Sequence, residues 1–137
     1  MNTAVKPIAL RLTPGADLKD ALIELTKDRA LGAGIVLTCV GSLAEASLRF
    51  AGQEETTTLS GPFEILSLVG TLSSEGVHLH IALADKEGKT VGGHVQVGCL
   101  IYTTAELVIG ELSGMTFLRT FDTVKVYEEL EVRDTKG

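Results

Sequence analysis

Apolar and polar residues alternate along most of this chain, with one interruption near the N-terminus. The segment from Val5 to Leu12 has the alternation of a β-strand, and Pro7 places it near a sheet edge because proline cannot donate to a ladder. After the TPG turn, apolar residues recur at helical spacing, with Asp17 as the expected N-cap and Gly32 as the expected stop. The apolar face of this predicted helix consists of Leu18, Ala21, Leu22 and Leu25.

Beyond Gly34 the pattern predicts one strand after another, separated by turns rich in Gly, Ser, Asp and Lys. We expect GSLA, residues 41–44, to be a tight connection, and FEILSLVG, residues 63–70, to be covered on both faces because both alternating faces are apolar. The fold class is therefore α+β: a mostly antiparallel β-sheet packed with one main N-terminal helix, in a single domain over residues 1–137. The expected strands lie within GIVLTCVG, EASLRFAG, FEILSLVGTLS, VHLHIALA, TVGGHVQV, AELVIGEL, MTFLRTF and VKVYEELEV.

All three histidines of the chain lie in one hairpin-sized stretch, GVHLHIALADKEGKTVGGHVQVGC. Side chains point alternately to the two faces of a strand, so His78 and His80 share one face with Ala82 and Ala84. The other face, which we expect to join the core, consists of Val77, Leu79, Ile81 and Leu83.

The length of the turn decides which face His94 takes. A three-residue loop over residues 86–88, with Gly88 in the left-handed conformation, places His94 directly opposite His80 on the same face. A loop of two or four residues, or a bulge at Gly92-Gly93, would send His94 to the core side instead. The position of Gly88 fits the three-residue loop.

In that register His78, His80 and His94 converge within reach of one ion. Three histidines that leave a coordination position open are typical of a catalytic zinc site, and similar sites hold other divalent metals. Two histidines in H-x-H spacing also occur on solvated strand faces, so the spacing alone leaves both interpretations open. A metal here would lower the pKa of a bound water, and Glu64, Asp85 and Glu106 are the candidate carboxylates beside it.

The composition of the chain limits the classes of partner that we expect it to bind. The net charge is −6 and no cluster of basic residues appears, which argues against direct binding to nucleic acid, since that affinity comes mostly from Lys and Arg. Hydrophobic residues make up 45% of the chain, yet no apolar run approaches the roughly 20 residues that span a bilayer. We therefore expect no membrane association, and expect the surplus apolar surface to form an interface between subunits.

The remaining motifs bear on compartment and chemistry. The start, MNTAVKPIALRL, lacks the features of a signal peptide, and Cys39 and Cys99 both lie in apolar strand-like runs. These features predict a cytoplasmic protein with two reduced, buried thiols. The chain has no G-x-S-x-G elbow, P-loop or dinucleotide-binding G-x-G-x-x-G, so the sequence does not identify a reaction and leaves open whether the protein is an enzyme.

Three strings, GPFEILSLVGTLS, HLHIALADKEGKTVGGH and GCLIYTTAELVIGEL, together resemble the plant-and-prokaryote conserved (PPC) domain in its stand-alone prokaryotic form without an AT-hook. The resemblance covers essentially the whole chain. It implies an α+β fold assembled as a homotrimer. The H-x-H pair and the later histidine recur in that family, which implies a divalent metal at His78, His80 and His94. We expect this metal to be zinc, with a small-molecule ligand or water completing its shell.

The same resemblance supplies an alternative function, a DNA-associated regulatory or protein-interaction module without catalytic activity. The family's DNA-binding label comes largely from the AT-hook, whose R-G-R-P core is absent from this chain. In the plant proteins the segment that matches Phe63 to Leu66 is tied to partner binding and is commonly preceded by Gly-Arg, whereas Pro62 stands in the place of that arginine here.

Overall fold

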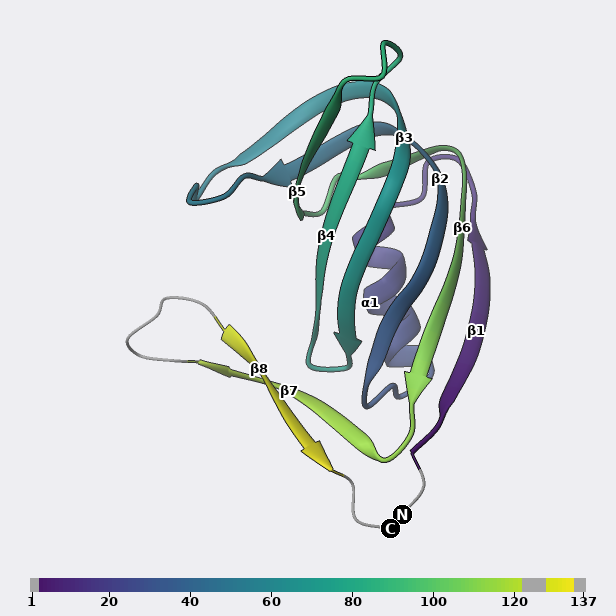
Figure 1. Ribbon diagram of the computed structural model, residues 1–137, viewed down its shortest axis with the longest axis vertical. Coiled ribbons are helices and arrows are strands. Elements are labelled where there is room, and N and C mark those ends of the chain that lie inside the picture. Colours follow the sequence, from purple (N-terminus) through teal and green to yellow (C-terminus); the bar gives the residue numbers. More distant parts are fainter. Residues whose placement is uncertain (1–2, 122–127, 135–137) are drawn as a thin grey trace.

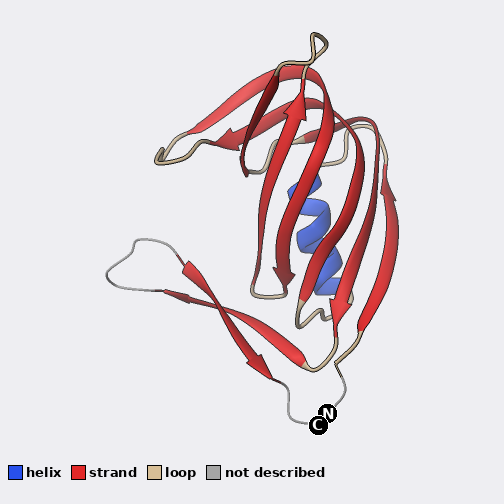
Figure 2. Ribbon diagram, viewed as in Figure 1, coloured by secondary structure: helices blue, strands red, loops and turns tan. Residues whose placement is uncertain are grey.

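The computed structural model describes residues 3–121 and 128–134, which form one helix and eight strands (Figure 1). The helix lies against one face of a large sheet, and a separate two-stranded hairpin projects away from it (Figure 2). This arrangement confirms the predicted α+β class. The elements are β1 (Val5–Leu12), α1 (Leu18–Asp28), β2 (Gly34–Arg49), β3 (Thr56–Ser73), β4 (Gly76–Ala84), β5 (Thr90–Val95), β6 (Leu100–Leu112), β7 (Met115–Phe121) and β8 (Glu128–Asp134).

The large sheet has six strands in the order β1-β6-β2-β3-β4-β5, and every pairing in it is antiparallel. The strand β1 lies at an edge, as Pro7 predicts. The sheet also curls, because the last residues of β2 pair with β5, Leu48 opposite Val95 and Arg49 opposite His94. The tip formed by β2 and β3 extends past β5 as a result (Figure 1).

The helix α1 begins and packs as its sequence predicts. The Asp17 carboxylate accepts a hydrogen bond from the backbone N–H of Asp20 at 3.0 Å, which caps the first turn. Leu18 and Leu22 are completely buried against the sheet. The helix ends at Asp28, before Gly32. Within residues 3–121 and 128–134, no helix has the length and apolar character needed to cross a bilayer.

The predicted tight connection at residues 41–44 is wrong, because β2 runs through it without a break. The strand accommodates this segment with an irregularity between Leu43 and Glu45 rather than with a turn. Leu43 is completely buried, and a turn would bring it to the surface. The position of Gly41 requires glycine for a reason other than a turn, because any side chain there would collide with the backbone of Thr104 on β6.

Within one chain, only one face of the strand β3 is covered. The expectation that both faces of residues 63–70 are covered is therefore wrong for the isolated chain. Phe63 and Leu68 are buried, whereas Leu66 is 54% and Val69 57% exposed. Because the helix covers the core face, these exposed side chains lie on the other face of the sheet. Further exposed apolar residues on the central strands β2 and β6 are Leu37, Val40 and Tyr102.

Two predictions concern the ends of the chain and its thiols. The last expected strand, VKVYEELEV, begins in residues 122–127, which lie outside the described residues, and a strand is present from Glu128 to Asp134.

Cys39 and Cys99 are both buried and no disulfide joins them, as predicted. The Cys99 thiol lies within hydrogen-bond distance of the Ser47 backbone, at 3.3 Å from its carbonyl oxygen.

Candidate metal site on the β4–β5 hairpin

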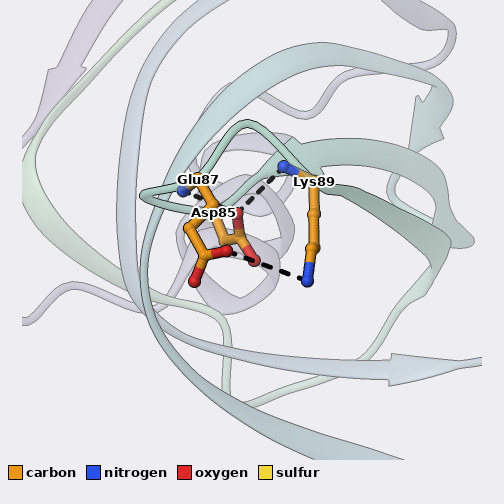
Figure 3. A network of polar contacts seen from close by, with 3 residues as sticks. All are labelled: Asp85, Glu87 and Lys89. Carbon is orange, nitrogen blue, oxygen red and sulfur yellow. Dashed lines mark hydrogen bonds and ion pairs between the residues drawn. The ribbon is translucent and has the colours of Figure 1, made fainter.

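The turn between β4 and β5 is the predicted three-residue loop. The backbone N–H of Asp85 donates to the carbonyl of Lys89 at 2.8 Å, and Gly88 has a φ of 83°. The Asp85 carboxylate accepts hydrogen bonds from the N–H groups of Glu87 and Lys89, both at 2.9 Å, and so holds the loop closed (Figure 3). The exposed Lys89–Glu87 ion pair, at 3.8 Å, adds little stability.

This loop sets the register that brings the histidines together. His80 lies directly opposite His94, and Ile81 lies opposite Gly93. The pairing continues without a bulge to the turn, so the Gly92-Gly93 pair does not change the register. Gly92 instead allows a close approach, because a side chain there would collide with the carbonyl oxygen of Ile81.

The three imidazoles lie on the face of the hairpin away from the core. His78 and His80 are exposed and His94 is half-buried, whereas Leu79 and Ile81, which point to the opposite face of β4, are buried. The ring centroids of His78 are 4.9 Å from His80 and 5.0 Å from His94, and those of His80 and His94 are 5.7 Å apart. One nitrogen from each ring lies within 4.8 Å of the other two.

This donor set fits a divalent metal. Zinc sits about 2.0–2.1 Å from imidazole nitrogen, so tetrahedral ligand nitrogens lie roughly 3.4 Å from one another. The rings therefore need to approach by about 1.5 Å at most, which rotation of the side chains of His78 and His80 can supply because both are exposed. Three neutral imidazoles also leave a fourth position for water or another ligand.

The surroundings of His78 and His94 disfavour the protonated form of both rings. Burial lowers the pKa of His94 to about 4, with Arg49 the next cause. Burial also lowers the pKa of His78, followed by the charges of His80, Arg119 and Arg49. At neutral pH, His78 and His94 are therefore neutral, the form in which histidine binds metals.

Several cavities open at the histidines. One, of about 280 Å³, lies beside β3 and is lined by Val69, Gly70, Thr71, His78 and His80, and two larger cavities adjoin each other. The inner cavity, of about 410 Å³, is lined by His78, His80 and His94 together with the Gly92-Gly93 backbone, Arg49 and Phe50. The outer cavity, of about 510 Å³, shares Arg49, His78 and His94 and adds the side chains of the β7–β8 hairpin and the β3–β4 turn. These additional charged residues are Glu75, Arg119 and Glu128.

The candidate carboxylates from the sequence lie elsewhere. Asp85 closes the turn, and Glu64 lines a different cavity beside that turn, of about 430 Å³. Glu106 lines another, of about 510 Å³, between β1, β2 and β6. The carboxylates that line a cavity with the histidines are Glu75 and Glu128, which the sequence analysis did not select. Arg49 and Arg119 were not predicted from the sequence either, because only the tertiary pairing of β2 with β5 and the docking of β7 bring them near the histidines.

A family model described as the Plants and Prokaryotes Conserved (PCC) domain matches residues 1–113. The chain belongs to this family. The PCC domain is the family that the sequence analysis identifies as PPC, so the match confirms that resemblance.

This PCC domain is similar to proteins of different lengths. It is 50% identical over 123 residues to the bifunctional protein GlmU of Synechococcus sp. (strain JA-3-3Ab), with 90% of this chain and 20% of that protein aligned. The chain thus spans about a fifth of the length of that relative. A solved structure of a hypothetical protein from Salmonella cholerae-suis is 42% identical, with a TM-score of 0.93, and the alignment covers 98% of this chain and 97% of that one.

A second solved structure is described as a metal-containing protein. It is the protein AF0104 from Archaeoglobus fulgidus, which is 28% identical to this PCC domain with a TM-score of 0.80. The alignment covers 95% of this chain and 96% of that one. The similarity therefore includes the histidine hairpin and is not confined to one part of the fold.

Proposed function

We propose that this PCC domain binds one divalent metal ion, with zinc the expected metal, through His78, His80 and His94. The observation that carries the proposal is the cluster itself: three imidazoles from two paired strands, each with a nitrogen within 4.8 Å of the others. The description of the similar Archaeoglobus protein as metal-containing supports it. The lowered pKa of His78 and of His94 adds support, because neither has to lose a proton at neutral pH.

A metal at this position would act as a Lewis acid and acidify a bound water or small ligand. The residues of the chain would orient the ion and its ligand. The ladder pairing of His80 with His94 fixes two of the three donors relative to each other, and buried Leu79 and Ile81 anchor the strand beneath them. The cavities of about 410 and 510 Å³ leave room for a small molecule beside the ion.

Metal analysis of the purified protein tests this function. The protein is prepared without exposure to nickel resin, in parallel with a variant that combines His78→Ala, His80→Ala and His94→Ala. We expect close to one equivalent of a divalent metal per wild-type chain and a near-complete loss in the variant. Equal metal content in the two proteins would refute the proposal. The core side chains of the hairpin are unchanged in the variant, so we expect it to fold.

We also propose that the chain assembles into a homotrimer through the outer face of the sheet. Val40 is 60% exposed and Val69 57% exposed, and both lie on central strands where an uncovered apolar side chain is costly. Leu66 and Tyr102, each more than half exposed, extend the same apolar surface. A second copy of the chain would cover it. The number three rests on the family resemblance.

A further inference from the structure

The recess at the histidines collects positive charge although the chain as a whole carries −6. Arg49 pairs with His94 across the β2–β5 ladder and lines both larger cavities. Arg119, on β7, donates to the hydroxyl of Thr71 at 2.8 Å, and Thr71 pairs with His78 across the β3–β4 ladder. Burial is the main cause of the lowered pKa of His78 and of His94, and the positive charge of Lys19 on α1 adds a smaller lowering to both.

We propose that the recess binds an oxyanion, the carboxylate or phosphate group of a small metabolite, between the metal at the three histidines and the guanidinium groups of Arg49 and Arg119. The inference rests on the proposed metal site and names the class of its ligand. An arginine presents paired N–H donors that match the oxygens of a carboxylate or phosphate. The open metal position supplies a third contact to the same group.

Charge balance is the physical reason for an anion. A divalent ion beside two guanidinium groups raises the electrostatic energy of all three, and the penalty grows as water is excluded. An oxyanion that touches the ion and the guanidinium groups turns this repulsion into attraction. Among the described residues that line the inner cavity, Arg49 carries the one permanent charge.

The outer cavity also has carboxylates, and they oppose the proposal in part. Glu75 and Glu128 line it beside Arg119. Burial lowers the pKa of Arg119, and the negative charge of Glu128 opposes that shift. These two carboxylates thus reduce the attraction of Arg119 for a ligand. They line the outer cavity and not the inner one, so Arg49 is expected to contribute more to anion binding than Arg119.

The test uses the full chain loaded with one equivalent of Co²⁺, whose visible spectrum reports its ligands. Inorganic phosphate and, separately, acetate are titrated into anion-free buffer. We expect a saturable spectral change with at least one of them. A response to phosphate alone assigns phosphate esters, a response to acetate alone assigns carboxylic acids, and a response to both supports the class. If neither anion changes the spectrum, the inference is overturned.

Three variants identify the role of the arginines. Arg49→Gln should weaken the responding anion by about tenfold or more, Arg119→Gln by less, and the control Arg11→Gln, on the far edge strand β1, should not change it. By linkage, Arg49→Gln should also raise Co²⁺ affinity in anion-free buffer and reduce the gain that the anion gives. A misfolded variant would instead lose Co²⁺ affinity in both buffers.

The outcomes separate the two proposals. If wild-type protein takes up no more Co²⁺ than the triple histidine variant, the metal site is wrong and the inference fails with it. If Co²⁺ binds through the histidines but Arg49→Gln and wild-type respond to phosphate and acetate with equal affinity, the metal site stands and the oxyanion inference is refuted.

Discussion

Lowering the pH of the metal-free protein should reduce its stability through His94. The environment of this side chain lowers its pKa from 6.5 to about 4, chiefly because the ring is withdrawn from water and secondly because Arg49 is close. Above pH 6.5 the folded and unfolded chains both hold a neutral imidazole, so His94 has no effect. Between pH 6.5 and about 4 the unfolded chain gains a proton that the folded chain does not, and the free energy of unfolding therefore falls as the pH falls.

The size of this loss follows from the two pKa values. Each pH unit between them corresponds to about 1.4 kcal/mol, so the full interval from 6.5 to about 4 gives an upper limit of about 3.5 kcal/mol. His94 is only half-buried, and solvent screens its interaction with Arg49. We therefore expect a loss of about 1–2 kcal/mol between pH 7.5 and pH 4.5.

Urea denaturation in the presence of a chelator, at pH 7.5 and pH 4.5, measures the effect. Other groups also titrate in this range, so the quantity to compare is the difference between wild-type and His94→Gln at each pH. The variant should lose about 1–2 kcal/mol less than wild-type on acidification. Thr90→Gln, an exposed substitution on the same strand, should lose as much as wild-type. Equal losses in wild-type and His94→Gln would refute the reasoning.

Three further predictions concern the turn, the thiols and the outer face. Gly88→Ala should cost about 1 kcal/mol in thermal or urea denaturation, because φ is 83° there while the space around it is open; no measurable cost would contradict the assigned turn. Cys39 and Cys99 should react slowly with a thiol reagent in the native state and fully after unfolding, since both are buried and burial raises the pKa of Cys39 to about 11; rapid native labelling would contradict this. Val69→Glu should shift the mass measured by light scattering from trimer to monomer, whereas an unchanged mass would show that the outer face is not the interface.

The histidine hairpin was predictable because its determinants are local. The alternation along β4 fixes the faces of His78 and His80, and the left-handed Gly88 fixes the loop length and thus the register of His94. The helix was predictable for the same reason, since Asp17 and the apolar spacing after it lie within a few residues of one another.

The course of β2 and the charged residues of the recess were not predictable from local pattern. Gly41 is typical of a turn, yet here it permits close contact with β6, and that requirement exists only once the two strands are paired. Arg49 reaches His94 because β2 continues through this segment and curls onto β5. Arg119 is 25 residues beyond His94 and arrives through the docking of a separate hairpin against Thr71. Each of these contacts depends on tertiary structure.

X-ray absorption at the zinc edge, on protein loaded with one equivalent of Zn²⁺, tests the metal site most directly. We expect a first shell with three imidazole nitrogens at about 2.0–2.1 Å and one further nitrogen or oxygen ligand. In the His80→Ala variant the number of imidazole nitrogens should fall by one or the ion should be lost. A shell of oxygen ligands without imidazole scattering, or an imidazole count that is the same in wild-type and in His80→Ala, would contradict the assignment of His78, His80 and His94 as the ligands.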